Sequence, residues 1–210
     1  MPRRSNTAER RDQIARALVR VMARRGYDGA SVAEVAAAAR LTPGLVHYHF
    51  KDKQEILLVA LRTLVAHHEG RLDERLAASS ADHVQQLRGF IDLHLGRGAE
   101  ADPEALACWV LVSGEALRQT KVRRELERAL NRIVRRLIAI IRSGVEAHVF
   151  SCVSAEEAAS ALLAVIQGYF VLAATARSMI PRGSAARSTL RMAEGLLRPR
   201  QPLIREEDRS

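Results

Sequence analysis

A short run in the N-terminal quarter of the chain gathers side chains suited to binding a polyanion. Its members are Thr42, Pro43, Gly44, His47, Tyr48, His49, Lys51 and Lys53, with Ser31 upstream. Hydroxyl, imidazole, phenol and ammonium groups bind phosphate oxygens and base edges, and a glycine lets the backbone come close to a ligand. We therefore expect this run to contact double-stranded DNA.

The residues of this run are expected to have different tasks. Tyr48 and His47 are expected to read base edges or sugar, while His49 and Lys53 hold phosphates. Ser31 and Lys51 are weaker phosphate candidates. For His49 a packing role against the first helix is the alternative, and for His47 the packing and the DNA-contacting interpretations both stay open.

Residue types that support catalysis are scattered elsewhere. The histidines show no Ser-His-Asp or metal-type spacing, and no glycine-rich phosphate loop follows a strand. Cys108 and Cys152 are isolated within apolar segments, as buried thiols in a reducing compartment are. We expect no enzyme, no cofactor and no metal site.

The positive charge is concentrated where the DNA-contacting run lies. Residues 1–51 carry ten Lys or Arg against four Asp or Glu, a net +6, while the rest of the chain carries only +3 of the total +9. A basic segment beside a nearly neutral one is typical of a protein that meets nucleic acid at one end. Arginine-rich composition alone is the alternative.

Local signals place the run on short helices. An apolar stripe at Ile14, Leu18 and Met22 predicts a first helix over about 7–25, ended by Gly26 as a left-handed cap. Ser31 with Glu34 forms a capping box for a second helix, and Thr42-Pro43 begins a third, over 43–50. Two short helices joined by a tight turn, behind a longer one, indicate a helix-turn-helix.

The remaining sequence predicts further helices and no strand. A long helix runs from about 51 to 78, and others are expected over about 82–96, 103–118, 122–147, 155–178 and 184–197. The predicted fold is all-α with about nine helices. It comprises a helix-turn-helix headpiece over 1–52, a ligand-binding and dimerisation body over 53–198, and a flexible tail over 199–210.

Residues 7–61 resemble the TetR family of bacterial repressors. The resemblance rests on Ile14 to Ala17, Gly26 to Val32, Val35-Ala36 with Ala39, Gly44 to Lys53, and Ile56-Leu57, in order and in register. It implies a homodimer that grips a pseudo-palindromic operator and is released by a small molecule. It points to Thr42, Gly44, Tyr48, His49 and Lys53 as DNA contacts.

Two positions depart from the family pattern. Arg40 occupies the turn where the family commonly has glycine, and a left-handed backbone there costs an arginine about 1 kcal/mol. Leu45 replaces a small or hydroxyl-bearing residue. Val46 and Phe50, four residues apart, are expected to form the buried face of the third helix.

The body carries a weaker resemblance, to the choline-responsive BetI branch, around Trp109 to Arg118. A quaternary ammonium needs a cage of aromatic faces, and this chain's few aromatics supply at most part of one, with Glu115 as counter-charge. The inducer therefore stays unidentified. The candidate ligand-binding residues are Phe90, His94, Trp109, Ser113, Glu115, Gln167, Tyr169 and Phe170.

Surplus apolar surface on the last two helices predicts the dimer. Leu162, Val165, Ile166, Tyr169, Val171 and Leu172 wrap more than one face of the 155–178 helix, and the final helix adds Leu190, Ala193, Leu196 and Leu197. The arginines of the 122–147 helix either form a second nucleic-acid surface or, in the favoured interpretation, a solvated face.

The uncharged stretch 158–176 is nearly long enough to span a membrane, but its alanines and interrupting polar residues suit a helix buried in protein. With an Arg-rich, polar N-terminus, this predicts a cytoplasmic protein with no membrane contact. The leading hypothesis is a ligand-controlled repressor. The alternative is a constitutive architectural DNA-binding protein without a ligand.

Overall fold

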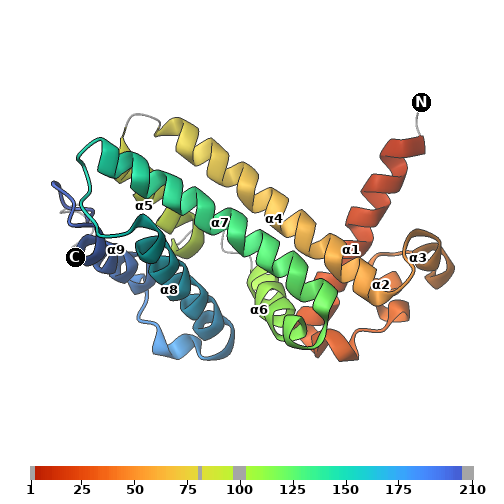
Figure 1. The fold of residues 1–210 in the computed structure, drawn as a ribbon. Helices are drawn as coiled ribbons and strands as arrows, with labels where there is room; N and C mark the ends of the chain where they lie inside the picture. The colour runs from red at the N-terminus through yellow and green to blue at the C-terminus, as the bar shows by residue number, and fades with distance from the viewer. Residues whose placement is uncertain (1–2, 80–81, 97–102, 205–210) are drawn as a thin grey trace. The chain divides into compact units, whose positions relative to one another are not determined.

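The computed structural model describes residues 3–79, 82–96 and 103–204. Over these residues the chain forms nine α-helices, one short 3-10 helix and no strand (Figure 1). The all-α expectation is confirmed. Helices α6 (Pro103–Arg118) and α9 (Ser184–Leu197) have the predicted bounds, and the others differ from prediction by a few residues at one or both ends.

The first three helices are α1 (Arg3–Gly29), α2 (Val32–Ala38) and α3 (Pro43–His49). Ser31 caps α2, and the complete capping box with Glu34 is present. The Thr42 hydroxyl caps α3 by accepting a hydrogen bond from the backbone N–H of Leu45, at 3.3 Å. Both predicted helix starts are therefore confirmed, each by side chains within three residues of the cap.

The turn between α2 and α3 closes in a Schellman motif. The N–H of Leu41 donates to the carbonyl of Ala36, and the N–H of Arg40 donates to the carbonyl of Ala37. This pattern requires a left-handed residue after the cap, and Arg40 adopts it with φ 56°. The arginine therefore carries a backbone strain of about 1 kcal/mol that a glycine would avoid.

Gly26 behaves differently from the predicted helix cap. Its φ is 70° but its ψ is 175°, so the backbone kinks there and the helical path then resumes to Gly29. A side chain would be strained at this φ, which explains the glycine. The kink turns Tyr27 and Asp28 away from the axis of the preceding part of α1.

By contact density the chain divides into two compact units, residues 1–67 with 102–129 and residues 68–101 with 130–210. This division differs from the split predicted at residue 52. The first unit holds α1 to α3, the start of α4 (Lys53–Ala78), α6 and the start of α7 (Thr120–Glu146). Its core includes Ile14, Leu18, Val35 and Leu57, all fully buried.

The second unit holds the rest of α4 and α7 with α5 (His83–Leu95), α8 (Ala155–Thr175), the 3-10 helix η1 (Arg177–Met179) and α9. Phe90, Ile91, Leu137 and Leu162 are fully buried within it.

The residues just after α9 pack against the second unit. Leu203 and Ile204 are buried, Arg88 of α5 donates to the carbonyl of Leu203, and Glu194 accepts from the N–H of Leu203 at 2.7 Å. This part of the segment predicted as a flexible tail is therefore anchored. Residues 205–210 lie outside the described residues.

Helix α8 buries little of its apolar surface within the protomer. Its buried residues are Ala155, Ala158, Ala159, Leu162 and Ile166. Among the described helices it is long and apolar enough to cross a membrane by length and composition. On α9, Leu190, Ala193 and Leu197 face inward, whereas Met192 and Leu196 are exposed.

Ion pairs link α4 and α7 within each unit. In the first unit Arg62 and Glu125 form an ion pair of 3.0 Å, and in the second unit Arg132 pairs with Glu69 at 2.7 Å. Arg136 also pairs with Asp73. These pairs support the solvated face over a second nucleic-acid surface, because they neutralise much of the basic run.

Candidate nucleic-acid interface

Helix α3 divides into an inward and an outward face. Val46 and Phe50 are 1% and 2% exposed, as predicted, while the Tyr48 side chain is 80% exposed. The exposed set on and beside α3 consists of Thr42, Pro43, Gly44, Leu45, His47 and Tyr48. The helix therefore presents a continuous surface of hydroxyl, imidazole, phenol and backbone groups to solvent.

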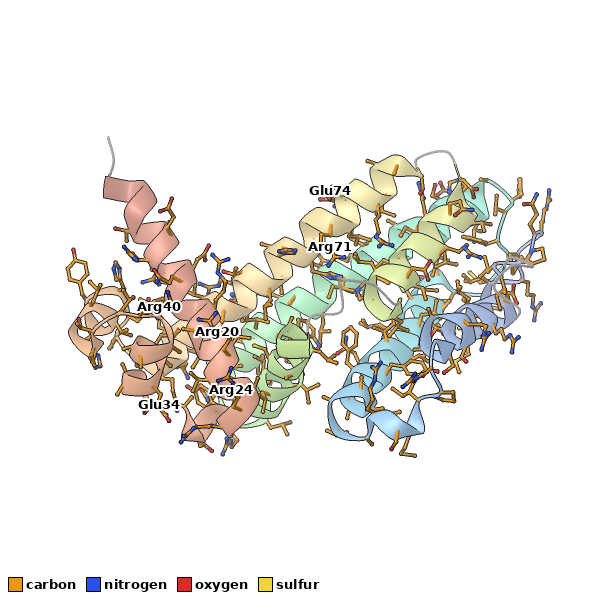
Figure 2. The ribbon with its side chains drawn as sticks, turned by 180° about the vertical axis from the view of Figure 1, so that it is seen from behind. Arg20, Arg24, Glu34, Arg40, Arg71 and Glu74 are labelled. Carbon is orange, nitrogen blue, oxygen red and sulfur yellow. The ribbon has the colours of Figure 1, made fainter. Side chains whose placement is uncertain are left out.

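Three side chains of α1 bind the carbonyl ends of α2 and α3. Gln13 donates to the carbonyl of Ala39 at 2.7 Å. Arg20, whose side chain is labelled in Figure 2, donates to the carbonyl of Ala38 at 3.0 Å. Arg11 donates to the carbonyl of His49. These bonds satisfy the unpaired carbonyls that every helix leaves at its C-terminus.

Arg11 has two further contacts that fix its position. Its guanidinium carbon lies 4.1 Å from the centroid of the Phe50 ring, and it forms an ion pair of 2.7 Å with Glu55 at the start of α4. The hydrogen bond from Arg11 lowers the pKa of the Glu55 carboxyl below its usual value. Arg11 thus ties α1 to the end of α3 and to α4.

Lys53 and Ser31, both predicted phosphate ligands, bind within the protein. The Lys53 ammonium donates to the carbonyl of Tyr27 at 2.7 Å and lies 4.3 Å from the centroid of the Tyr27 ring. The Ser31 hydroxyl and the Glu34 carboxylate hydrogen-bond each other at 3.0 Å. The contact with Ser31 also lowers the pKa of Glu34.

The other two phosphate candidates differ in exposure. Lys51 is exposed, whereas His49 is half-buried. The His49 ring meets the Tyr48 ring edge to face, with centroids 5.1 Å apart. The His49 ring thus lies next to the aromatic side chain that projects farthest from α3.

A polar network joins the headpiece to α6. The buried Glu115 carboxylate accepts hydrogen bonds from Arg118 and, at 2.6 Å, from Gln119. Arg118 also pairs with Asp28 at 3.1 Å, and Gln54 of α4 donates to Gln119 at 2.7 Å. Glu115, predicted as a ligand counter-charge, is here neutralised by its own neighbours.

Tyr27 is also part of this network. Burial raises the pKa of its phenol, partly offset by a hydrogen bond with Gln119. The kink at Gly26, the first turn of α4 and the end of α6 therefore share one set of hydrogen bonds.

Three predicted ligand-binding residues come together in the second unit. The His94 ring lies 4.5 Å from that of Phe90 and 6.5 Å from that of Phe170, centroid to centroid. Its Nε2 lies 2.9 Å from Nε2 of His68, a residue that sequence reasoning missed. Its Nδ1 lies 2.7 Å from the carbonyl oxygen of Phe90. Since a carbonyl only accepts, Nδ1 carries the proton and Nε2 accepts from His68.

This setting keeps His94 neutral. Burial, as the main cause, and the neighbouring His68 together lower its pKa to about 3. An imidazole that stays uncharged between two aromatic rings presents an apolar surface with one defined hydrogen-bond axis.

The other ligand candidates are distributed over both units. Tyr169 and Gln167 are half-buried on α8 of the second unit. Trp109 and Ser113 lie on α6 of the first unit, where the Ser113 hydroxyl donates to the Trp109 carbonyl at 2.9 Å. Two surface hollows in the second unit, of about 580 and 340 Å³, are lined by none of the eight candidates.

Sequence reasoning missed the supporting residues Arg11, Gln13 and Arg20, and the partners Arg118 and Gln119. The signal available in the sequence was the presence of polar residues beside the buried apolar stripe of the first helix, close to two short helices whose ends need hydrogen-bond donors.

Two family models match the chain. Residues 14–60 match the bacterial regulatory proteins of the tetR family. Residues 83–198 match the BetI-type transcriptional repressor C-terminal model. The HTH-type transcriptional regulator BetI of Rhizobium meliloti is 28% identical over 173 residues, which are 81% of each chain.

Solved structures share the architecture. A transcriptional regulator from Saccharomonospora viridis, solved in complex with choline, has a TM-score of 0.76 and 28% identity, over 90% of this chain and 95% of that one. A TetR transcription regulator from Haloarcula marismortui has a TM-score of 0.81 at 19% identity, over 90% and 99% of the two chains. This second likeness shows the fold alone.

Replacing Tyr48 with alanine is predicted to weaken DNA binding without unfolding the protein. The side chain is so exposed that the free energy of unfolding should change by less than about 0.5 kcal/mol, while loss of a base or sugar contact should raise Kd about tenfold. The probe is a duplex selected from a randomised library by the purified protein. Lys53→Met is the contrasting variant, expected to lower both stability and affinity. Wild-type affinity in Tyr48→Ala would contradict the assignment.

The buried His94 is predicted to make stability depend on pH. Its folded pKa of about 3 lies below the ordinary value of 6.5, so as the pH falls the unfolded chain takes up a proton that the folded chain does not. Stability present above pH 6.5 is therefore lost progressively between about pH 6.5 and 3. From about pH 7 to about pH 5, wild type should lose about 2 kcal/mol more than His94→Asn in urea unfolding. Parallel pH profiles would disprove it.

Proposed function

The chain belongs to the tetR family of bacterial regulatory proteins, with a BetI-type C-terminal part, and from this premise we propose that it is a ligand-responsive repressor. As a member of this family it is a DNA-binding transcriptional regulator. We infer further that it holds a pseudo-palindromic operator as a homodimer until a small molecule binds its body.

The outward face of α3 carries the proposal. Val46 of α3 and Phe50, its C-cap residue, face inward, which leaves Tyr48, His47 and the helix start at Thr42 exposed for a partner. A recognition helix reads base edges in this way, with its N-terminal residues in the major groove. Lys51 and His49 lie beside this face as phosphate candidates. Lys53 and Ser31 contribute chiefly by holding the headpiece together.

The exposed side of α8 supports the homodimer. Six of its exposed residues follow a heptad-like spacing along one stripe: Glu157, Ala161, Ala164, Gly168, Val171 and Thr175. Small residues at this spacing let two helices approach closely. Met192 and Leu196 of α9 add apolar side chains that are 47% and 41% exposed. Two copies of α8 and α9 would bury these surfaces in a twofold four-helix interface.

Twofold symmetry determines the shape of the operator. Two copies of α3 related by a dyad read two half-sites of inverted sequence, spaced by about 34 Å or a multiple of it. The proposed partner is therefore a pseudo-palindromic duplex.

The chemistry around His94 supports a small ligand with an apolar or aromatic part. Phe90 and Phe170 offer ring faces, and the His68–His94 pair offers one polar axis. The Saccharomonospora viridis relative binds choline. A choline cage needs several aromatic faces around the cation, so choline is one probe among several here.

The network around Glu115 supports coupling between body and headpiece. A ligand that shifts α6 would disturb the ion pair between Arg118 and Asp28 and the hydrogen bond from Gln54 to Gln119. Such a ligand changes DNA affinity only if it binds two arrangements of the protein unequally. The alternative is an architectural DNA binder, which needs no such difference. A bacterial regulator works where the DNA is, so we place the protein in the cytoplasm.

A charge in the α8 stripe is predicted to split the dimer. Val171→Glu places two unpaired carboxylates in the apolar interface and should weaken association about a hundredfold or more. Light scattering after size exclusion should then give the mass of one 23.2 kDa chain. Leu117→Glu is the matched control, since Leu117 is 86% exposed on α6, and it should stay dimeric. A dimeric Val171→Glu would contradict this interface.

Ligand release is tested by a thermal-shift screen of metabolites that includes choline. A compound that binds the folded body should raise the melting temperature and, at the same concentration, weaken binding to the selected duplex about tenfold. Phe170→Ala should remove both effects. If a compound stabilises the protein but leaves duplex affinity unchanged, ligand-controlled repression is wrong. Tight duplex binding without any responsive ligand would favour the architectural alternative.

A further inference from the structure

Arg40 has a strained backbone, and its guanidinium has no polar partner among the described residues. Its left-handed φ of 56° is required by the Schellman turn that joins α2 to α3. The residue is exposed, and within the described residues its side chain makes no hydrogen bond or ion pair. The folded protomer thus gains nothing visible from an arginine where glycine fits best.

Neighbouring arginines of the headpiece are committed to the protein itself. Arg11 pairs with Glu55, Arg20 binds the carbonyl of Ala38, and Arg25 pairs with Glu34 at 3.0 Å. Since Glu34 is already bound to Arg25 and Ser31, the nearby acid of α2 does not neutralise Arg40. The positive charge of Arg40 is therefore available to a partner.

The place of Arg40 indicates which partner. It lies two residues before Thr42, the residue that caps α3, in the turn that joins α2 to α3, and Figure 2 labels its side chain. When a recognition helix enters the major groove, the helix before it crosses the sugar-phosphate backbone. The turn between the two helices then comes close to the edge of the groove, where phosphates lie. A residue held in strain at such a place is a candidate for function.

We propose that Arg40 binds a backbone phosphate of the operator and so positions α3 in the groove. The proposal rests on the assignment of α3 as the reading helix. Arg40 is a positioning residue: it contributes affinity and register, while Tyr48 and His47 read the bases. The contact is electrostatic, so it weakens as salt rises and counterions compete for the phosphate.

Glycine at position 40 separates strain from binding. Arg40→Gly should leave the melting temperature unchanged or raise it by up to about 4 °C, because the left-handed backbone is no longer strained. The same variant should bind the selected duplex about five- to tenfold more weakly at about 0.15 M salt. Stability and affinity thus move apart, which a merely destabilised protein does not show.

Three further variants test the charge. Arg40→Gln should lose affinity as Arg40→Gly does, and the slope of log K against log salt should fall by about one per protomer. Arg40→Lys keeps the charge and should retain most of the affinity. Arg24→Gln is the matched control, since Arg24 is exposed farther along α1 and, within the described part of the chain, also has no polar partner (Figure 2). It should bind as wild type does.

Several results would overturn the proposal. Wild-type affinity and salt slope in Arg40→Gln would exclude a phosphate contact, and an equal loss in Arg24→Gln would reduce the effect to net charge. A lysine variant as weak as the glutamine variant would also exclude it. Tyr48→Ala, measured alongside, distinguishes failure of this inference from failure of the α3 assignment. If Tyr48→Ala loses affinity and Arg40→Gln does not, only the inference about Arg40 fails. If neither loses affinity, α3 is not the reading helix.

Discussion

A helix of seven residues is too short to persist in water by its own hydrogen bonds, and the DNA-contacting surface that we propose lies on such a helix. The bonds from α1 to the carbonyl ends of α2 and α3 compensate for this shortness. Gln13 and Arg20 satisfy the end of α2, and Arg11 satisfies the end of α3 while pairing with Glu55 of α4. Without these contacts Val46 and Phe50 would have to hold α3 by packing alone.

Polar contacts also connect the headpiece and the start of α4 to the end of α6. The residues concerned in the headpiece and in the first turn of α4 include Tyr27, Asp28 and Gln54. Gln119 contacts Tyr27 and Gln54, and Arg118 pairs with Asp28. The buried Glu115 is stable there because the Arg118 guanidinium neutralises its charge and the Gln119 amide donates a second hydrogen bond. A buried carboxylate with its partners removed is costly, so this cluster favours a single arrangement and responds sharply when that arrangement changes.

The second unit is organised by burial instead of by charge. Phe90, Ile91 and Leu162 form its interior, and His94 joins them only as a neutral imidazole whose proton points to a carbonyl. By contrast, α8 leaves a whole stripe of small and apolar residues uncovered. In a single protomer that stripe is exposed to solvent.

Much of the secondary structure could be predicted because its signals are local. Ser31 with Glu34, Thr42 with Pro43, and Asp82 cap helices through groups no more than three residues away, and the strain at Arg40 follows from the turn it occupies. The motif pieces between Ile14 and Leu57 likewise indicated the family, which the family models confirm. The tertiary structure alone decided which distant polar groups meet: Lys53 with Tyr27, Arg118 with Asp28, and His94 with His68. Such partners lie up to about ninety residues apart in the chain, and their meeting depends on how whole helices pack, which no local pattern specifies.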